Sequence, residues 1–165
     1  DALIEKLQKA STHNQGFSTT ELAGAALLDL EWGKLTSADN IDVEGFEKAV
    51  AAKLAMPKEV QYRYRSPYFK HIFGSDGYAS GYYTYLWAEV LDTDGFELFK
   101  ERGIFDPATA KAFRENVLEM GGSEDPMQLY INFRGRKPDA NALLRHRGLI
   151  PDSSKNVPVK SAEGK

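Results

Sequence analysis

Helix start signals recur at short intervals along this chain and strongly limit what it can fold into. Proline follows an aspartate or a serine directly at three places, Ser66-Pro67, Asp106-Pro107 and Asp125-Pro126. This pairing is typical of a helix N-terminus, since a capping oxygen precedes a residue that has no N–H to satisfy. Between these signals and the following glycines, apolar residues recur at helical spacing. The sequence therefore predicts an all-α fold, an irregular bundle of several helices joined by short turns.

The predicted helices differ widely in length. They cover approximately residues 2–10, 18–34, 43–56, 66–73, 78–102, 107–120, 126–133 and 139–147. A capping box of Ser18 and Glu21 is expected to open the second of them. No linker or repeat divides residues 1–150, which we expect to form one helical segment. Residues 151–165 are polar with little to bury, and we expect them to be disordered.

Composition excludes several classes of protein. The 165 residues carry a formal net charge of −3 with both signs interspersed, which gives no electrostatic reason to expect nucleic acid as a partner. No apolar run approaches the length of a membrane span, so we expect no membrane partner. The absence of cysteine excludes disulfides and thiolate metal sites, but it assigns no redox compartment.

Residues 68–87 are the richest in candidate chemistry. Tyr78, Tyr82 and Tyr85 recur at i, i+4 and i+7, so they would share one face of a helix that begins at Tyr78. Phenols stay protonated near neutral pH and can donate hydrogen bonds to an anionic oxygen, and His71 lies just upstream. An aromatic core stripe is the other interpretation. Full burial of these tyrosines within the chain's own core would favour it.

Other kinds of catalytic site find little support. The histidines His13, His71 and His146 are far apart, and no H-E-x-x-H motif is present, so no complete metal site is expected within this chain. Ser80 lies in no G-x-S-x-G elbow and has no identifiable base. The glycine-bearing turn around Asp76 lacks a P-loop lysine, and its own carboxylate opposes phosphate.

Residues 71–87 resemble the substrate-binding segment of the thimet oligopeptidase family of zinc metallopeptidases. Further segments fit the same family in order and approximate spacing, and the resemblance extends from about residue 2 to residue 150. They are Asn14-Gln15-Gly16-Phe17, Arg63-Tyr64-Arg65-Ser66, Gly121-Gly122-Ser123-Glu124-Asp125, Phe133-Arg134-Gly135-Arg136-Lys137-Pro138 and His146-Arg147-Gly148-Leu149. The wording of residues 71–74 and 77–83 is most similar to the bacterial peptidyl-dipeptidase, or dipeptidyl carboxypeptidase, branch.

The resemblance implies a larger, mostly helical zinc peptidase with a deep substrate cleft. In that family the zinc ligands lie on an H-E-x-x-H helix and a following helix, N-terminal to the region matched here. This chain is therefore expected to be the C-terminal segment, with the N-terminal remainder as its partner. Zinc is implied for the complete enzyme, whereas this chain alone is expected to bind none and to be inactive. Bacterial cytoplasm and periplasm both stay open as locations.

The resemblance also implies roles for individual residues. Tyr85 would be catalytic, donating a hydrogen bond to the oxyanion of the tetrahedral intermediate. His71 and Tyr78 would bind the backbone of an oligopeptide substrate, and Tyr82 would line the same cleft. In the peptidyl-dipeptidase branch the product is a dipeptide released from the substrate's C-terminus.

Two glycines are implied to serve the same site. Gly74 and Gly77 would belong to the substrate-binding loop and let it close over the peptide, because glycine reaches backbone angles that other residues avoid. Ser75-Asp76 departs from the family's pattern, which has a tighter glycine-rich link between the histidine and the first tyrosine. The departure affects the placement of His71 relative to Tyr78.

A second function remains open beside the peptidase. The chain would then be a non-catalytic helical domain that binds a peptide or a partner protein through its tyrosines, which anchor interfaces well. Under the peptidase interpretation, surfaces that face the missing part would be exposed. We therefore expect self-association of the isolated chain.

Overall fold

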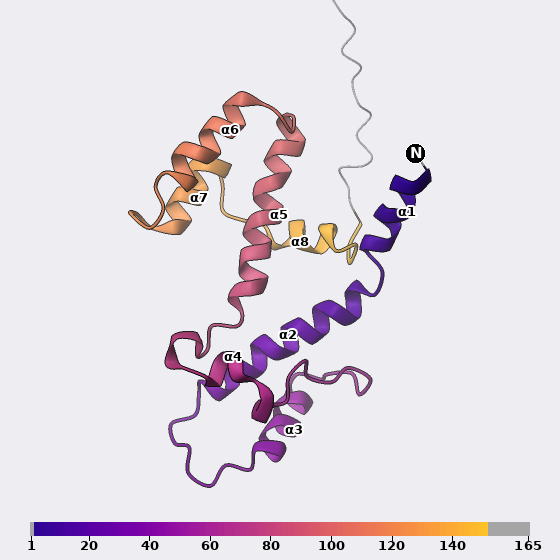
Figure 1. Cartoon of the computed structure of the whole chain (residues 1–165), viewed down its shortest axis with the longest axis vertical. Coiled ribbons are helices and arrows are strands. Elements are labelled where there is room, and N and C mark those ends of the chain that lie inside the picture. The colour runs from indigo at the N-terminus through magenta and orange to yellow at the C-terminus, as the bar shows by residue number, and fades with distance from the viewer. Residues whose placement is uncertain (1, 152–165) are drawn as a thin grey trace, which may run out of the picture. The chain divides into compact units, whose positions relative to one another are not determined.

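The computed structural model describes residues 2–151, and within that range it contains helices and turns but no strand (Figure 1). The α-helices are α1 (Ala2–Ser11), α2 (Gln15–Trp32), α3 (Val43–Lys53), α4 (Lys70–Phe73), α5 (Thr84–Arg102), α6 (Pro107–Phe113), α7 (Pro126–Arg134) and α8 (Ala140–His146). Two 3₁₀ turns, η1 (Ser66–Tyr68) and η2 (Asp76–Tyr78), and a π-helical turn, η3 (Arg114–Leu118), complete them. The predicted all-α class is confirmed. The disorder expected for the tail falls on residues 152–165, which lie outside the described residues.

The chain divides into two compact units. Residues Asn14–Glu89 form one, which we call the tyrosine unit, and residues Asp1–His13 with Val90–Lys165 form the other, which we call the terminal unit. Helix α5 begins in the tyrosine unit and continues into the terminal unit. Because two compact units can belong to one domain, the single segment expected for residues 1–150 stays a prediction.

The tyrosine unit is built on α2, with α3 beside it (Figure 1). Its core joins small residues of α2 to aromatic and aliphatic residues of the segment that follows α3. The members of this core are Ala25, Ala26, Phe69, Ile72 and Tyr82. Alanines on α2 permit this close packing because they leave room for the rings, and Phe69 meets Tyr82 edge to face at 4.9 Å between ring centroids.

A buried carboxylate fixes the irregular segment before η1. Glu47 of α3 is 3% exposed, and its two carboxylate oxygens accept hydrogen bonds from the Ser66 N–H and the Arg65 Nε–H. Burial raises the pKa of Glu47, but the hydrogen bonds from Ser66 and Arg65 outweigh it and leave the pKa below its usual value. Trp32 Nε1 donates to Ser66 Oγ at 2.9 Å, so α2 and α3 together hold the entry to the tyrosine-bearing segment.

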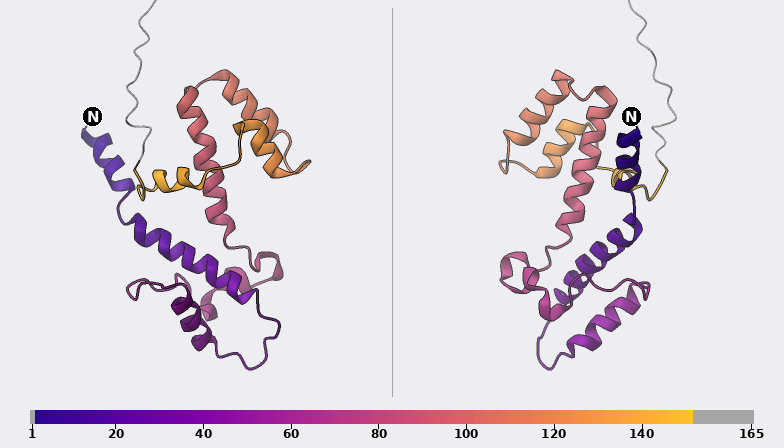
Figure 2. Two further views of the ribbon diagram at one scale, coloured as in Figure 1. Left: turned by 180° about the vertical axis from the view of Figure 1, so that it is seen from behind. Right: turned by 45° about the vertical axis from the view of Figure 1, so that its right-hand side comes forward.

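The terminal unit packs α6 and α7 side by side against α5 (Figures 1 and 2). Phe99 of α5, Phe113 of α6 and Phe133 of α7 form its aromatic centre, with centroid distances of 5.1–6.2 Å. A fully buried carboxylate, Asp94, accepts hydrogen bonds from the Tyr130 hydroxyl and from two nitrogens of Arg136. These contacts join α5 to α7 and to the segment that follows it.

Three predicted helix boundaries are wrong. Helix α2 begins at Gln15 after Asn14, which has a φ of 56°, so Ser18 and Glu21 lie inside the helix rather than at its cap. The helix expected to start at Tyr78 starts at Thr84. The helix expected to reach residue 120 changes from α to π geometry after Phe113. In each case the deviation lies at a boundary, whereas the helix itself exists.

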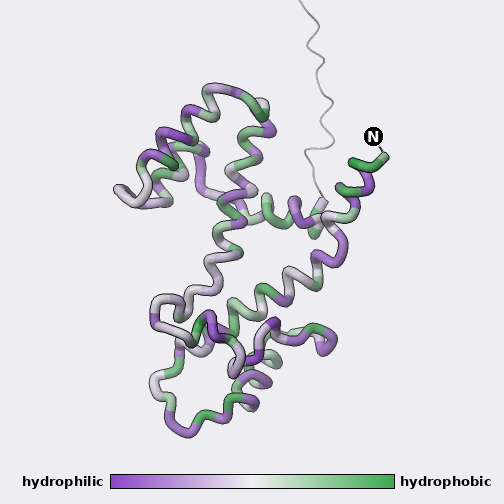
Figure 3. Tube along the Cα trace, in the orientation of Figure 1, coloured by the Kyte–Doolittle hydropathy of each residue, from purple (hydrophilic) through white to green (hydrophobic). Residues whose placement is uncertain are grey.

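Helix α1 leaves apolar side chains uncovered. Leu3, Ile4 and Leu7 are each more than half exposed, and Figure 3 shows hydrophobic and hydrophilic residues together on this helix. An apolar patch of this kind is compatible with association, and self-association stays a prediction. No helix in the described part of the chain combines the length and apolar character needed to cross a membrane.

Asp106 gives a direct test of the helix caps. Its carboxylate accepts hydrogen bonds from the Thr109 N–H at 2.8 Å and the Thr109 hydroxyl at 2.6 Å, and Thr109 is fully buried. Replacing Asp106 by alanine is expected to lower the free energy of unfolding by about 1 kcal/mol, measured by urea denaturation. Asp106→Asn, which keeps an accepting oxygen, should lose much less. Equal losses in the two variants would contradict a capping role.

Candidate substrate-binding site

Four residues that the sequence singled out come together in the tyrosine unit. His71 of α4 lies with its Nε2 3.3 Å from the hydroxyl of Tyr85 of α5. The His71 ring stacks on Tyr78 of η2 at 4.8 Å and meets Tyr82 edge to face at 5.6 Å. Tyr82 in turn meets Tyr85 at 5.1 Å. We call these four residues the histidine–tyrosine cluster.

The helical face that predicted this grouping does not exist. Only Tyr85 lies in a helix of more than one turn, because α5 begins at Thr84. Tyr78 belongs to a 3₁₀ turn, and Tyr82 lies in the turn between that element and α5. The backbone instead folds back between Tyr78 and Tyr82, and this turn brings the three rings around His71.

The tyrosines of the cluster differ in exposure. Tyr78 is 59% exposed and Tyr85 is 51% exposed, so about half of each residue is open to solvent. Tyr82 is 7% exposed and belongs to the core of the tyrosine unit, where burial raises the pKa of its phenol. The interpretation as an entirely internal aromatic stripe therefore fits Tyr82 alone.

Gly74 and Gly77 sit on the loop between His71 and Tyr78, and neither adopts a positive φ. Gly74 closes α4, where a Cβ would lie 2.7 Å from the Lys70 carbonyl oxygen, so close approach explains glycine here. At Gly77 the nearest atom to an added Cβ is 3.8 Å away. The backbone freedom expected of both glycines is not used in this conformation, and closure of the loop stays a prediction.

Asp29 is the residue of this site that the sequence analysis missed. Its Oδ1 accepts a hydrogen bond from the Ser80 N–H and its Oδ2 accepts one from the Tyr82 N–H, both at 2.9 Å. A signal was present in the sequence: Asp29 lies four residues after Ala25 and three before Trp32, on the apolar face of α2. An acid on a buried face needs a partner, and here the partners are backbone amides.

The described residues do not form a zinc site. No group of three or more histidine, aspartate or glutamate side chains within residues 2–151 is arranged to hold a metal ion. His71 faces tyrosines rather than further ligands. A zinc ion implied by the family therefore does not fit the part of the chain that the structure describes.

The chain is similar in sequence to known proteins, and the relatives that it matches are peptidases. The chain belongs to peptidase family M3, whose model matches residues 1–149. This confirms the family resemblance recognised from residues 71–87 and the outlying segments.

Three relatives illustrate the match. The chain is 43% identical over 152 residues to a dipeptidyl carboxypeptidase of Escherichia coli, and the matched region covers 90% of this chain and 22% of the relative. It is 51% identical over 104 residues to oligopeptidase A of Haemophilus influenzae, covering 62% and 15%. It is 44% identical over 90 residues to a probable cytosolic oligopeptidase A of Arabidopsis thaliana, covering 52% and 13%. The chain thus spans about a fifth or less of the length of these curated relatives.

Proposed function

We propose that this chain supplies the substrate- and oxyanion-binding part of a zinc metallopeptidase that releases dipeptides from the C-terminus of oligopeptides. The observation that carries the proposal is the exposed pair of His71 Nε2 and Tyr85 hydroxyl, 3.3 Å apart, on a chain of family M3. The dipeptidyl carboxypeptidase relative, which matches 90% of the chain, supports dipeptide release over internal cleavage.

Tyr85 would act as a hydrogen-bond donor to the oxyanion that develops on the scissile carbonyl. A phenol has one O–H, so this donor is available to substrate only if it is not given to His71. The tautomer of His71 that carries its proton on Nε2 solves this, because Nε2–H then donates to the Tyr85 oxygen. The phenol O–H is left free for the substrate, and its donor strength is increased by the bond it accepts.

Tyr78 and Tyr82 would hold this pair from two sides. Tyr78 stacks on His71 with an interplanar angle of 22°, which fixes the plane of the imidazole, and its own exposed hydroxyl can bind a peptide carbonyl. Tyr82 meets both His71 and Tyr85 edge to face and is almost fully buried. We therefore assign Tyr82 to support of the pair, with little surface of its own for the substrate lining first expected of it.

This proposal gives no residue of the chain a metal-binding role. Since the described residues do not fit zinc, the chain's share of the reaction is to bind the peptide and to stabilise negative charge. Gly74 and Gly77 would allow the loop that joins His71 to Tyr78 to move when peptide binds.

Product analysis tests the proposal. The full-length peptidase that carries this chain is expected to convert an unblocked decapeptide stepwise into dipeptides from its C-terminus, followed by mass spectrometry. The 165-residue chain alone is expected to hydrolyse no peptide. After incubation with zinc and dialysis into metal-free buffer, it is expected to retain no stoichiometric zinc. Internal fragments from the full-length protein would contradict dipeptide release. Peptide binding by a full-length protein without any cleavage would favour the non-catalytic alternative.

A further inference from the structure

We propose that Asp29 is a positioning residue for the site, and that it sets the placement of the Tyr78 and Tyr85 hydroxyls about His71. It would do so by holding the turn at residues 80–82, through which the backbone passes from η2 to α5. This inference rests on the function proposed above and assigns a further residue to it. Asp29 itself would contact neither substrate nor metal.

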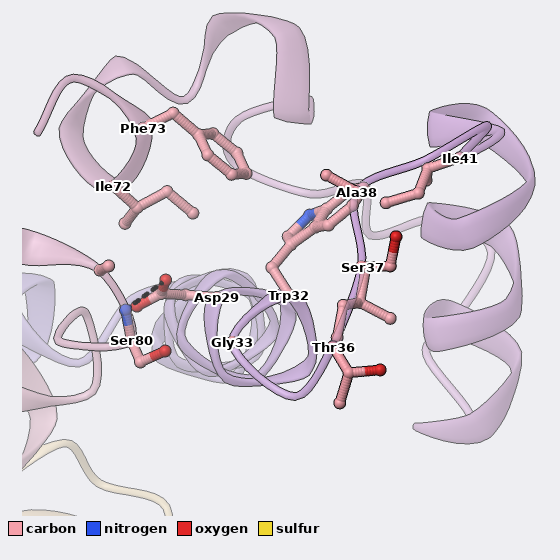
Figure 4. Close-up of a pocket in the computed structure, with 12 residues that line it drawn as sticks. Asp29, Trp32, Gly33, Thr36, Ser37, Ala38, Ile41, Ile72, Phe73 and Ser80 are labelled. Atoms are coloured by element: carbon pink, nitrogen blue, oxygen red, sulfur yellow. Dashed lines mark hydrogen bonds between the residues drawn. The ribbon is translucent and has the colours of Figure 1, made fainter. Parts of the chain in front are cut away.

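The carboxylate holds the turn at two points. One oxygen accepts a hydrogen bond from the Ser80 N–H at 2.9 Å (Figure 4). The other accepts one from the Tyr82 N–H, also at 2.9 Å, and Asp29 is 2% exposed. Between the two, Gly81 donates its N–H to the Tyr78 carbonyl at 3.1 Å. Every backbone N–H from residue 80 to residue 82 is thus bonded.

The conformation of this turn needs outside support. Ser80 has a φ of 57°, in the left-handed region that costs a non-glycine residue about 1 kcal/mol or more. Such a residue persists where the surroundings determine its geometry, and the nearest determinant is the Asp29 carboxylate, 51 positions earlier in the chain. The tyrosine periodicity predicted a helix through Ser80, whereas the structure has at this place the turn that Asp29 bonds.

The surroundings of Asp29 argue against a general structural role. It borders a cavity of about 410 Å³ whose other lining residues are mainly apolar, among them Trp32, Ile72 and Phe73 (Figure 4). No cation pairs with Asp29 in the described part of the chain, and its hydrogen bonds go to backbone amides. Burying an acid beside apolar side chains is costly, so an apolar residue would serve packing better. A carboxylate is needed where two N–H groups must be held at once.

Gly33 also contributes to the placement of the turn at residues 80–82. It follows the last residue of α2, and a Cβ placed there would lie 1.9 Å from Ser80 Oγ and 3.2 Å from Ser80 Cβ. A side chain at this position would therefore force the Ser80 hydroxyl to rotate and the Ser80 Cβ to shift. The C-terminal part of α2 and the residue after it thus contact the turn in two ways. Asp29 accepts its hydrogen bonds, and Gly33 has no side chain to collide with Ser80.

Asp29→Asn in the full-length peptidase tests the inference. The amide keeps the size of the side chain but replaces one acceptor oxygen with an N–H₂ donor, so one of the two N–H groups loses its bond. We expect kcat to fall about tenfold with KM little changed, since a displaced donor affects the transition state more than binding. In the isolated chain, hydrogen exchange at the Ser80 and Tyr82 amides should quicken by about tenfold or more.

Asp42→Ala is the matched control. Asp42 lies in the same unit and its Oδ1 also accepts a backbone bond, from the Gly45 N–H at 3.0 Å, at the N-terminus of α3. It should lower the stability of the tyrosine unit and leave both kcat and the exchange of the Ser80 and Tyr82 amides unchanged. If Asp29→Asn acts only by lowering stability, Asp42→Ala should change kcat and amide exchange in the same way. If Asp29 positions the site, only Asp29→Asn should change them.

Gly33→Ala keeps the inference testable if Asp29→Asn does not fold. It should lower kcat by pushing Ser80 away, and adding Ser80→Gly should restore kcat because the clashing atoms are removed. Normal kcat in Asp29→Asn despite faster exchange would overturn the positioning role alone, as would failure of this rescue. Normal turnover in Tyr85→Phe would overturn the proposed function and the positioning role with it.

Discussion

Replacing Tyr85 by phenylalanine is expected to lower kcat of the full-length peptidase proposed above about 10²–10³-fold, the usual cost of removing one oxyanion donor. The ring stays, so its contacts with Tyr82 and His71 are kept while the O–H is lost. The zinc content of the protein should not change, because the described residues of this chain include no metal-binding group. Steady-state kinetics on a C-terminally unblocked peptide, with metal analysis of the same sample, measures both.

Tyr82→Phe is the control for this experiment. Tyr82 belongs to the same cluster, but it is 7% exposed and its ring supports the pair from the core side. Loss of its hydroxyl is expected to leave most of the turnover intact. Full turnover in Tyr85→Phe, or an equal loss in both variants, would remove Tyr85 from its assigned role.

Helix starts were predictable because their signals are local. Asp42, Asp106, Asp125 and Asp139 each accept a hydrogen bond from a backbone N–H two or three residues later, as capping residues do. Nothing elsewhere in the chain has to be known for such a contact. The existence and order of the helices after each of these residues therefore follow from the sequence.

The start of α5 could not be predicted in the same way. The pattern of Tyr78, Tyr82 and Tyr85 fits a helix, and local preference alone would continue the helix back to Tyr78. Asp29 instead bonds the amides of Ser80 and Tyr82 from 51 and 53 positions away, and Ser80 takes a left-handed φ. A contact between such distant residues depends on how α2 packs, which periodicity does not report.

The candidate site was found through residue types and family resemblance rather than through its geometry. The residues His71, Tyr78, Tyr82 and Tyr85 do come together, but on α4, η2, a turn and α5 instead of one helical face. The histidine was expected upstream, yet its stacking on Tyr78 depends on the fold of the intervening loop. Substrate binding and catalysis by these residues remain proposals.

Asp94→Asn is expected to give the largest loss of stability, about 3 kcal/mol in the free energy of unfolding. Asp94 is fully buried in the terminal unit and bonds the Tyr130 hydroxyl and two nitrogens of Arg136. Arg134 Nε lies 3.8 Å from the same carboxylate and has no hydrogen-bond partner. Removing the negative charge leaves the Arg136 guanidinium and the Arg134 Nε without the carboxylate beside them. Glu101 still pairs with Arg134, and Arg136 is partly exposed, so the loss should lie at the lower end for a buried pair.

The pH dependence of stability tests the same network. Burial raises the pKa of Asp94, but the hydrogen bonds from Arg136 and Tyr130 outweigh it and lower the pKa below 3.8. A carboxyl whose pKa is lowered by folding stabilises the protein above the pKa it has when unfolded and loses this effect as the pH falls through the folded value. Chemical denaturation between about pH 6 and pH 3 should therefore show stability falling on acidification in the original chain, and falling less in Asp94→Asn.

Glu101→Gln is the matched control, because it removes a carboxylate from the same unit and from the same α5 helix. Glu101 pairs with Arg134 at 2.7 Å but its side chain is 54% exposed, and such a pair contributes about 0–1 kcal/mol. Its loss should lower the free energy of unfolding much less than Asp94→Asn does. Similar losses for Asp94→Asn and Glu101→Gln would contradict a larger contribution from the buried Asp94 than from the exposed Glu101.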